Sequence, residues 1–381
     1  MSDYTVYLDN AATTKPAQAV IDAVAISLRD GFYNPSAIYK PAVAAAKEIE
    51  NCRMLIMDSL QAEQVVFTSG GTEANNLGIL GRLSNSRQGG RVLYSLLEHP
   101  SVKSACQVVP EGFEAIGIPI DPSGRVDLHA LDDLLTPDIR MVCVMQVNNE
   151  TGALQPLDEV AQAIKEKAPG VWLHVDGVQG YLRHPIRLKD AGIDSYAFSG
   201  HKIHGPKGVG ALALGRKNSL KPCLFGGGQE SGLRSGTENT PGIAGLMAAV
   251  RDFPREHVMR RLKIHLYERL KTAIPALIVN GPDPQSAYAC DHIINLSFPP
   301  VRAETMLHSL EAKGVYVSHG SACSSRKSRH SDTLKAMGVS QAALEGAIRF
   351  SLSPLTTADE IEVAVRATLE SFEALKAFTR R

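Results

Sequence analysis

Lys202 is the residue from which a chemical function can be argued first. It lies in Ser199-Gly200-His201-Lys202, after a strand-like run over 194–198, and a turn rich in glycine and histidine follows at 203–210. A lysine amine that is held deprotonated forms a Schiff base with an aldehyde cofactor. A solvated lysine on a surface loop is the alternative that this segment alone leaves open.

A second segment has the features of an anion site. The apolar run 65–68 is typical of a buried strand, and it leads through Ser69-Gly70-Gly71-Thr72 into an expected helix. Glycine lets the backbone approach a ligand, and the free N–H groups at a helix N-terminus favour phosphate. A plain strand-to-helix turn would also use glycine, so both interpretations stand at this point.

Two titratable side chains follow other expected strands. His99 comes after the strand at 92–95, and Asp176 ends the apolar run 171–175. Ligands of α/β sheets bind at such strand ends. A buried carboxylate needs a positive partner, which a protonated pyridine nitrogen would supply. A structural histidine and a helix-capping aspartate are the alternatives.

Together these groups match the needs of pyridoxal 5′-phosphate (PLP). Lys202 would hold its aldehyde, the turn at 69–72 its phosphate, and Asp176 its protonated ring nitrogen. A ring protonated in this way accepts electrons from a neighbouring carbanion.

Alternating strands and helices must position these groups. Continuous apolar strands such as 141–147 are typical of parallel sheets, and helices are predicted between them, for example over 42–60 and 157–167. The pattern predicts an α/β fold in which helices flank a mostly parallel central sheet.

The predicted pattern of helices and strands changes near residue 258. A long helical region is predicted from Gly242 to about Ile274, and a compact α+β unit follows, ending in a helix over 358–377. We expect a large PLP-binding α/β domain over 15–257. A smaller α+β domain would comprise 1–14 and 258–381.

Composition excludes several function classes. The 381 residues are 44% hydrophobic, and 40 basic residues balance 40 acidic ones, so no global charge steers the protein toward nucleic acid or an anionic membrane. The N-terminus lacks a basic segment followed by an apolar core, and no apolar run is long enough to cross a bilayer. We therefore expect a cytoplasmic protein that binds neither membranes nor nucleic acid directly.

The six cysteines are scattered through the chain, without a CxxC pair. In a reducing compartment they are expected to be free thiols, mostly buried as small apolar residues. No metal site is expected.

The sequence resembles the class-V aminotransferase-like enzymes of PLP fold type I, and within them the cysteine desulfurases of the NifS/IscS type. The resemblance covers essentially the whole chain. The motifs that carry it are Leu8 to Thr14, Phe67 to Glu73, Glu98-His99, Asn148 to Gly152, His174-Val175-Asp176, Ser199 to Gly210, Arg234 to Thr237, and Gly320-Ser321-Ala322-Cys323.

The resemblance implies a role for each matching residue. Lys202 binds the PLP aldehyde and acts as acid and base at the substrate Cα, while His99 stacks on the ring and Asp176 pairs with its nitrogen. The other implied contacts are Gln179 and Asn149 to the ring hydroxyl, Gly71, Thr72, Ser199 and His201 to the phosphate, Thr237 to the phosphate from a neighbouring subunit, and Asn34 and Arg349 to the substrate carboxylate.

Cys323 is the nucleophile in this interpretation. Its thiolate would attack the sulfur of L-cysteine, giving a persulfide on Cys323 and L-alanine. Glycine and serine neighbours predict an exposed, mobile loop, in which the sulfur could reach first the cofactor and then an acceptor. An unreactive free cysteine is the alternative.

The resemblance also implies partners. A homodimer is expected, and the length of 324–337 favours delivery of sulfur to a separate acceptor protein. This acceptor is either an Fe–S scaffold or a protein of tRNA thiolation or cofactor sulfuration; the chain ends at Arg381, without the longer tail that housekeeping IscS-type enzymes use to dock their scaffold.

Two rival functions remain at this stage. A selenocysteine lyase or another aminotransferase-like relative would use the same PLP site. A sulfur-carrier or Fe–S assembly subunit would hold persulfide sulfur with little turnover.

Overall fold

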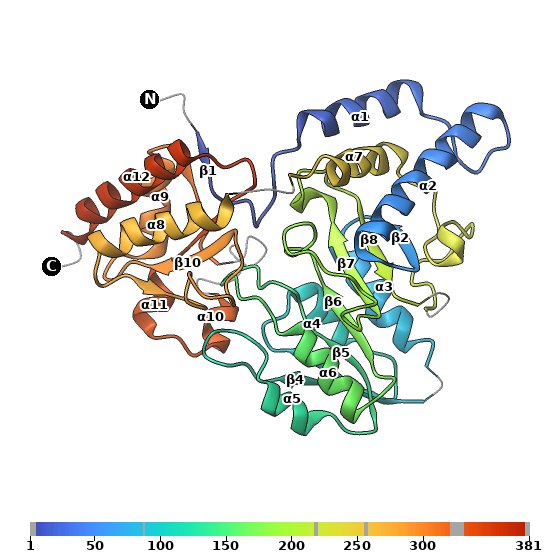
Figure 1. Ribbon diagram of the computed structural model, residues 1–381, viewed down its shortest axis with the longest axis horizontal. Helices are drawn as coiled ribbons and strands as arrows, with labels where there is room; N and C mark the ends of the chain where they lie inside the picture. Colours follow the sequence, from blue (N-terminus) through green and yellow to red (C-terminus); the bar gives the residue numbers. More distant parts are fainter. Residues whose placement is uncertain (1–4, 87, 217–219, 255–257, 321–330, 378–381) are drawn as a thin grey trace.

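A seven-stranded sheet forms the centre of the larger part of the molecule (Figure 1). The computed structural model describes residues 5–86, 88–216, 220–254, 258–320 and 331–377. The strand order is β2-β8-β7-β6-β5-β3-β4, and all neighbours are parallel except that β8 runs antiparallel to both β2 and β7. The strands are β2 Gln64–Thr68, β3 Gly90–Ser95, β4 Phe113–Ile118, β5 Ile139–Cys143, β6 Trp172–Asp176, β7 Ser195–Ser199 and β8 Gly210–Leu214. The predicted α/β fold with a mostly parallel sheet is confirmed.

Helices cover both faces of this sheet because its strands are apolar on both sides. On β2, Val65 and Phe67 join one hydrophobic core, while Val66 between them joins the core on the opposite face. The first face is covered by α1 Gln18–Asp30, α2 Lys40–Leu60, α5 Leu128–Leu134, α6 Leu157–Lys167 and α7 Thr240–Arg251. The second is covered by α3 Gly71–Leu83 and α4 Pro100–Gln107.

A second hydrophobic core lies in the smaller part of the molecule, at the left of Figure 1. Here an antiparallel sheet of order β12-β10-β9 packs against α8, α9 and α12. The elements are α8 Met259–Ala273, β9 Ile278–Val279, β10 Ile293–Ser297, α9 Ala303–Glu311, α10 Asp332–Ala336, α11 Gln341–Gly346, β12 Ala347–Ser351 and α12 Ala358–Lys376. The N-terminal β1, Val6–Tyr7, pairs in parallel with β11, Val315–Tyr316, and its Val6 belongs to this core.

The long helical region predicted from 242 to about 274 is not one continuous helix, so this prediction is wrong. The structure has two helices here, because α7 ends at Arg251 and α8 begins at Met259. Pro254 explains the break, since proline lacks the N–H of a helical residue and clashes with the preceding turn.

The segment after β1 connects the two cores. Asp9 forms a bridge with Ser351 of β12, while the backbone N–H of Thr14 donates to the carbonyl of His201, directly after β7. The N-terminal residues thus reach the end of β7, where Lys202 lies. Among the described helices, none is long and apolar enough to cross a lipid bilayer.

Candidate active site

A cavity of ≈ 180 Å³ opens where the carboxyl ends of β5, β6 and β7 face the beginnings of α3 and α4. Ten of the residues predicted for the site lie in its wall: Gly71, Thr72, His99, Asn149, Asp176, Gln179, Ser199, His201, Lys202 and Arg349. They come from segments far apart in the chain, so the fold brings the predicted constellation together in one place.

Lys202 ends a short 3₁₀ turn, Gly200–Lys202, that follows β7. Its Nζ donates to the backbone carbonyls of Ala11 (2.5 Å) and Ala12 (2.7 Å), which belong to the segment after β1. The buried guanidinium of Arg183 donates to the carbonyl of Lys202. The lysine is therefore held from both ends, with its amine at the cavity wall.

Asp176 is fixed by its neighbours. Its Oδ2 accepts a hydrogen bond from Asn75 Nδ2 at 2.8 Å, and its Oδ1 accepts one from the backbone N–H of Val178 at 3.0 Å. Both partners are donors, so the carboxylate oxygens are held in place as hydrogen-bond acceptors. The side chain is therefore prepared to meet a positive group in the cavity.

A buried chain of hydrogen bonds supports this aspartate from behind. His174 Nε2 lies 3.0 Å from Asn75 Oδ1, and His174 Nδ1 lies 2.8 Å from Ser195 Oγ, which also accepts from Trp172 Nε1. Burial lowers the pKa of His174 to about 3, so its ring is neutral. A neutral ring has one donor and one acceptor. Because an amide oxygen can only accept, the proton lies on Nε2.

His99 caps α4, and this role fixes which of its ring nitrogens accepts a hydrogen bond. Its Nδ1 accepts from the backbone N–H of Ser101 at 3.1 Å and lies 2.8 Å from Ser101 Oγ. A ring nitrogen that accepts carries no proton, so the proton of the neutral ring is on Nε2. The imidazole lies in the cavity wall beside Asp176.

Glu98 adds a second carboxyl group below the cavity. Burial and the nearby Asp176 raise its pKa well above the usual value, although the backbone N–H of Met145 donates to its Oε1 at 2.6 Å. Two buried carboxylates do not ionise together readily, so the protonated form of Glu98 is favoured in this position.

The phosphate end of the cavity has the predicted anion-binding features. Gly71 begins the 13-residue helix α3, and Gly70 before it has φ 153°, a conformation that favours glycine. A Cβ added at Gly71 would lie 2.6 Å from Val178 Cγ2, so this position has no room for a side chain larger than that of glycine. Ser199 and His201 lie across from this helix end, and burial lowers the pKa of His201 to about 4.

The hydrogen bonds of Gln179 indicate whether the cavity can accept PLP. Its Nε2 donates to the carbonyl of Ala11 at 2.8 Å, while its buried Oε1 accepts no hydrogen bond from any residue of the described ranges. A buried amide oxygen in a cavity wall calls for a donor there, and the ring hydroxyl of PLP is one. With the lysine, the carboxylate and the helix N-terminus in the same cavity, the residues fit this cofactor.

Arg349 of β12 forms the other side of the cavity. Its guanidinium is 1% exposed, forms an ion pair with Asp9 at 2.6 Å, and donates to the carbonyl of Asn149 at 2.8 Å. The fork is thus rigidly oriented, as bidentate recognition of a carboxylate requires.

Three predicted site residues are not in the cavity wall of this chain. Asn34 is exposed, and its Oδ1 accepts from the backbone N–H of Ser36. Thr237 is exposed in the loop before α7. Cys323 lies outside the described residues.

The described residues that flank 321–330 lie near the cavity. Ser331 Oγ and Thr333 Oγ1 donate to the two carboxylate oxygens of Glu150 at 2.5 and 3.0 Å. A Cβ added at Gly320 would lie 3.7 Å from the same carboxylate. Glu150 follows Asn149 of the cavity wall, so Ser331 is held beside the site and Gly320 lies close to the same carboxylate.

Sequence reasoning assigned no role to several residues that shape the site. Asn75, His174 and Ser195 act only through contacts with distant segments, and Arg183 acts through a backbone carbonyl. For His174 the signal was the short motif it shares with Asp176.

Comparison with known proteins gives a consistent result. Residues 6–363 match the family described as aminotransferase class-V. The chain is 36% identical to a cysteine desulfurase of Nostoc sp., covering 98% of this chain and 94% of that one. It is also 36% identical to cysteine desulfurase NifS of Azotobacter vinelandii, covering 95% and 91%. A solved structure described as a NifS-like protein superposes with a TM-score of 0.90 at 30% identity, covering 98% of this chain and all of that one.

Proposed function

The chain belongs to the aminotransferase class-V family, and from this premise we propose how its cavity performs the reaction of a PLP-dependent cysteine desulfurase, which converts L-cysteine to L-alanine. The observation that carries the proposal is the meeting of Lys202, Asp176 and Arg349 in one cavity. We assign these three residues to one active site.

The cofactor side holds PLP. Lys202 would bind its aldehyde and Asp176 its ring nitrogen. Gln179 and Asn149 would bind its hydroxyl, and the start of α3 with Ser199 and His201 would bind its phosphate. When bound, PLP withdraws electrons from the carbon that carries the substrate amine. His99, which lines the same cavity, would stack on the ring.

The substrate side orients L-cysteine. The guanidinium of Arg349 binds the substrate carboxylate, and its ion pair with Asp9 keeps it from turning away. Lys202 Nζ moves the proton at the substrate Cα, since it is the lysine amine of the cavity wall.

Cys323 receives the sulfur. Its thiolate attacks the sulfur of the substrate; a new S–S bond forms, the substrate C–S bond breaks, and the electron pair of that bond stays with the carbon that becomes the methyl group of alanine. Support comes from the hydrogen bond of Ser331 to Glu150 and from the position of Gly320 near the same carboxylate, beside the cavity.

Cys323→Ala tests this step. We expect the variant to bind PLP but to form no alanine from L-cysteine and no persulfide, which is measured by alkylation and peptide mass spectrometry. Cys223→Ala is the matched control, because this thiol is free and exposed elsewhere. Alanine formation that persists in Cys323→Ala would contradict the proposal and favour a lyase.

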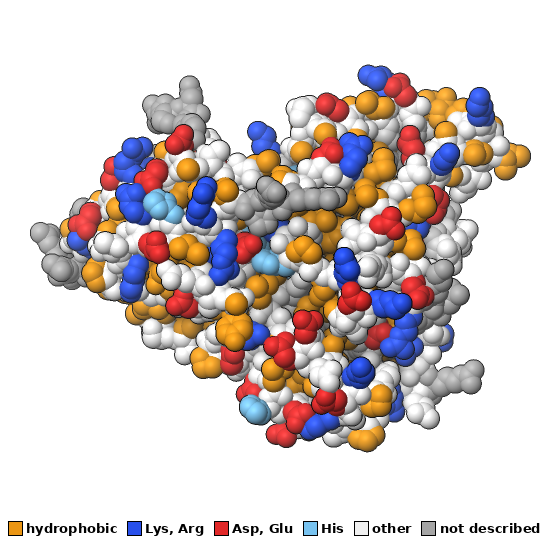
Figure 2. Space-filling model, viewed as in Figure 1, with side chains coloured by type: hydrophobic (Ala, Val, Ile, Leu, Met, Phe, Trp, Pro, Cys, Tyr) orange, Lys and Arg blue, Asp and Glu red, His pale blue; other side chains and the backbone are white. Residues whose placement is uncertain are grey.

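We also propose that the chain works as a homodimer, in which the partner's copy of Thr237 completes the phosphate site. Figure 2 shows hydrophobic side chains gathered over α1 and α2 at the upper right. The exposed hydrophobic side chains of α1, α2 and the segment between them include Phe32 (67% exposed), Ile38 (95%) and Val43 (55%), and apolar side chains grouped on a surface are typical of a protein contact.

Three further proposals complete the functional picture. The chain divides into a large domain, 15–257, and a small domain, 1–14 with 258–381, which matches the separate cores. The five cysteines of the described residues are free, which suits the reducing cytoplasm. The sulfur acceptor is a separate protein, either an Fe–S scaffold or a protein of tRNA thiolation or cofactor sulfuration.

A further inference from the structure

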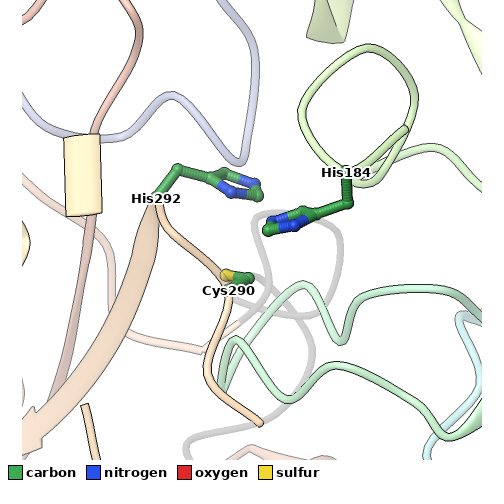
Figure 3. A group of neighbouring side chains, drawn as sticks. All are labelled: His184, Cys290 and His292. Carbon is green, nitrogen blue, oxygen red and sulfur yellow. The ribbon is translucent and has the colours of Figure 1, made fainter. Parts of the chain in front are cut away.

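Three side chains with metal-binding atoms meet where the two parts of the molecule join. His184 lies in the turn that follows β6, and Cys290 and His292 lie directly before β10. Figure 3 shows the two imidazole rings facing one another, with Cys290 beneath them. The described residues contain no other group of three histidines, cysteines or acidic residues so arranged.

The distances nearly match those of a bound metal. One ligand atom from each of the three residues lies within 4.8 Å of the other two. In a tetrahedral zinc site, N···N and N···S separations are about 3.4 to 3.6 Å, given metal–ligand bonds of about 2.0 to 2.3 Å. The three side chains therefore need to close by little more than about 1 Å.

The donor set selects the metal. Two imidazoles and a thiolate suit a borderline cation such as Zn²⁺, whereas Mg²⁺ and Ca²⁺ prefer oxygen ligands. Three protein ligands leave a fourth tetrahedral position, which a water molecule would fill. Binding releases the thiol proton of Cys290 to solvent, and the metal is neither oxidised nor reduced.

Charged residues near Cys290 balance the negative charge that its thiol would gain on losing the proton. Lys263 donates to the carbonyl of Cys290, and the buried Arg183 precedes His184. Asp291, between the two other ligands, lies 3.5 Å from Arg260. The two cations stabilise a thiolate, and the carboxylate offsets part of their repulsion of a metal ion.

A cation has a route to the site. Cys290 and His292 are fully buried, but His184 is only half-buried and lines a surface cavity of ≈ 320 Å³ together with Gln155 and Tyr288. The backbone N–H of Asp291 lies 3.5 Å from His184 Nε2, a long contact that coordination could replace at little cost.

We propose that His184, Cys290 and His292 bind one Zn²⁺ ion, which links the turn after β6 to the segment before β10. The link would restrain the turn that carries Arg183, whose guanidinium holds the carbonyl of Lys202. It lies outside the cavity assigned to PLP, since none of the three residues is in that wall.

Equilibrium dialysis of the PLP-loaded protein against ZnCl₂, followed by metal analysis, tests the site. All proteins carry Cys323→Ser, so that this thiol cannot contribute. We expect one zinc per chain, and affinity at least about 100-fold weaker in His184→Leu, Cys290→Ala and His292→Asn, a larger loss than that of an outer-shell partner. At free zinc 100-fold above Kd, Tm should rise by about 3 °C in the parent protein alone.

Matched controls are Cys223→Ser and His308→Asn, which remove an exposed thiol and an exposed imidazole elsewhere. They should bind zinc like the parent. His184→Leu is the decisive variant. The side chain of His184 is only half-buried, and the PLP absorbance of the variant protein reports whether the cavity is folded. Parent-like zinc affinity in His184→Leu, or less than half a zinc per parent chain at saturation, would overturn the proposal.

Discussion

The two sides of the cavity are built in different ways. On the cofactor side, Asp176 and Lys202 lie at or after the ends of neighbouring parallel strands and are supported by short-range turns and a buried hydrogen-bond chain. On the substrate side, Arg349 comes from the antiparallel sheet and depends on Asp9 from the other end of the chain. The cofactor side is built mainly on one sheet, with the carbonyls of Ala11 and Ala12 accepting from Lys202, whereas the substrate side depends on contacts between separate cores.

This difference indicates a division of labour. In our proposal, the cofactor side holds PLP, which stays bound to the enzyme, and the substrate side binds L-cysteine and releases L-alanine. Changes on the cofactor side should therefore affect cofactor binding and rate, whereas changes on the substrate side should affect KM.

The largest effect is expected from Asp176→Asn. Loss of the carboxylate removes the negative charge that stabilises a protonated ring nitrogen, so kcat should fall by about 100-fold to 1,000-fold. Steady-state alanine formation measures it. Asp127→Asn, which keeps a good helix cap on α5, is the control. A fall below tenfold would show that the pairing with the ring nitrogen is misassigned.

Arg349→Lys should act next most strongly, and on KM. A lysine keeps the charge but not the two-pronged geometry, so KM for L-cysteine should rise about 10-fold to 100-fold with PLP absorbance retained. Arg91→Lys, at an exposed ion pair with Asp138, is the control. A changed kcat with unchanged KM would place Arg349 outside substrate binding.

The buried support of Asp176 should appear in the pH dependence of stability. His174 is neutral in the fold with a pKa of about 3, whereas in the unfolded chain it takes up a proton below about pH 6.5. Its presence thus costs stability as pH falls from about 6.5 toward 3, by up to about 1.4 kcal/mol per pH unit.

Urea unfolding at several pH values measures this cost. His174→Gln should flatten the dependence below about pH 6, whereas His308→Gln, at an exposed imidazole, should not. Equal slopes in both variants would mean that the imidazole of His174 is protonated in the fold.

The smallest effect is expected from Glu98→Gln. Burial and Asp176 raise the pKa of Glu98 well above its usual value, which favours the neutral side chain, so Gln should be a close substitute. Its neutral replacement should change kcat/KM by less than about fivefold, which corresponds to about 1 kcal/mol. A much larger loss would show that an ionised Glu98 is needed.

The cofactor side was the part that the sequence could predict. Lys202, Asp176 and the turn at Gly71 each follow an apolar run, and a run of this kind places its end at the edge of a parallel sheet. The order of β8, antiparallel between β2 and β7, was not predictable, since strand pairing is decided by contacts distant in sequence.

The same reason explains what sequence reasoning missed. Asn75 matters because it meets Asp176 and His174, and the His184 cluster exists only because two separate segments fold against each other. The break before α8 was predictable from Pro254. Burial and long-range hydrogen bonds, in contrast, are properties of the folded chain.

Reduction with borohydride, followed by peptide mass spectrometry, tests the central claim most directly. Borohydride converts the link between a lysine and PLP into a stable amine, which marks the lysine that holds the cofactor. We predict the mark on Lys202, whose Nζ lies at the cavity wall, and none on Lys207 in the same turn. A mark on another lysine, or none on any peptide after incubation with PLP, would contradict the account.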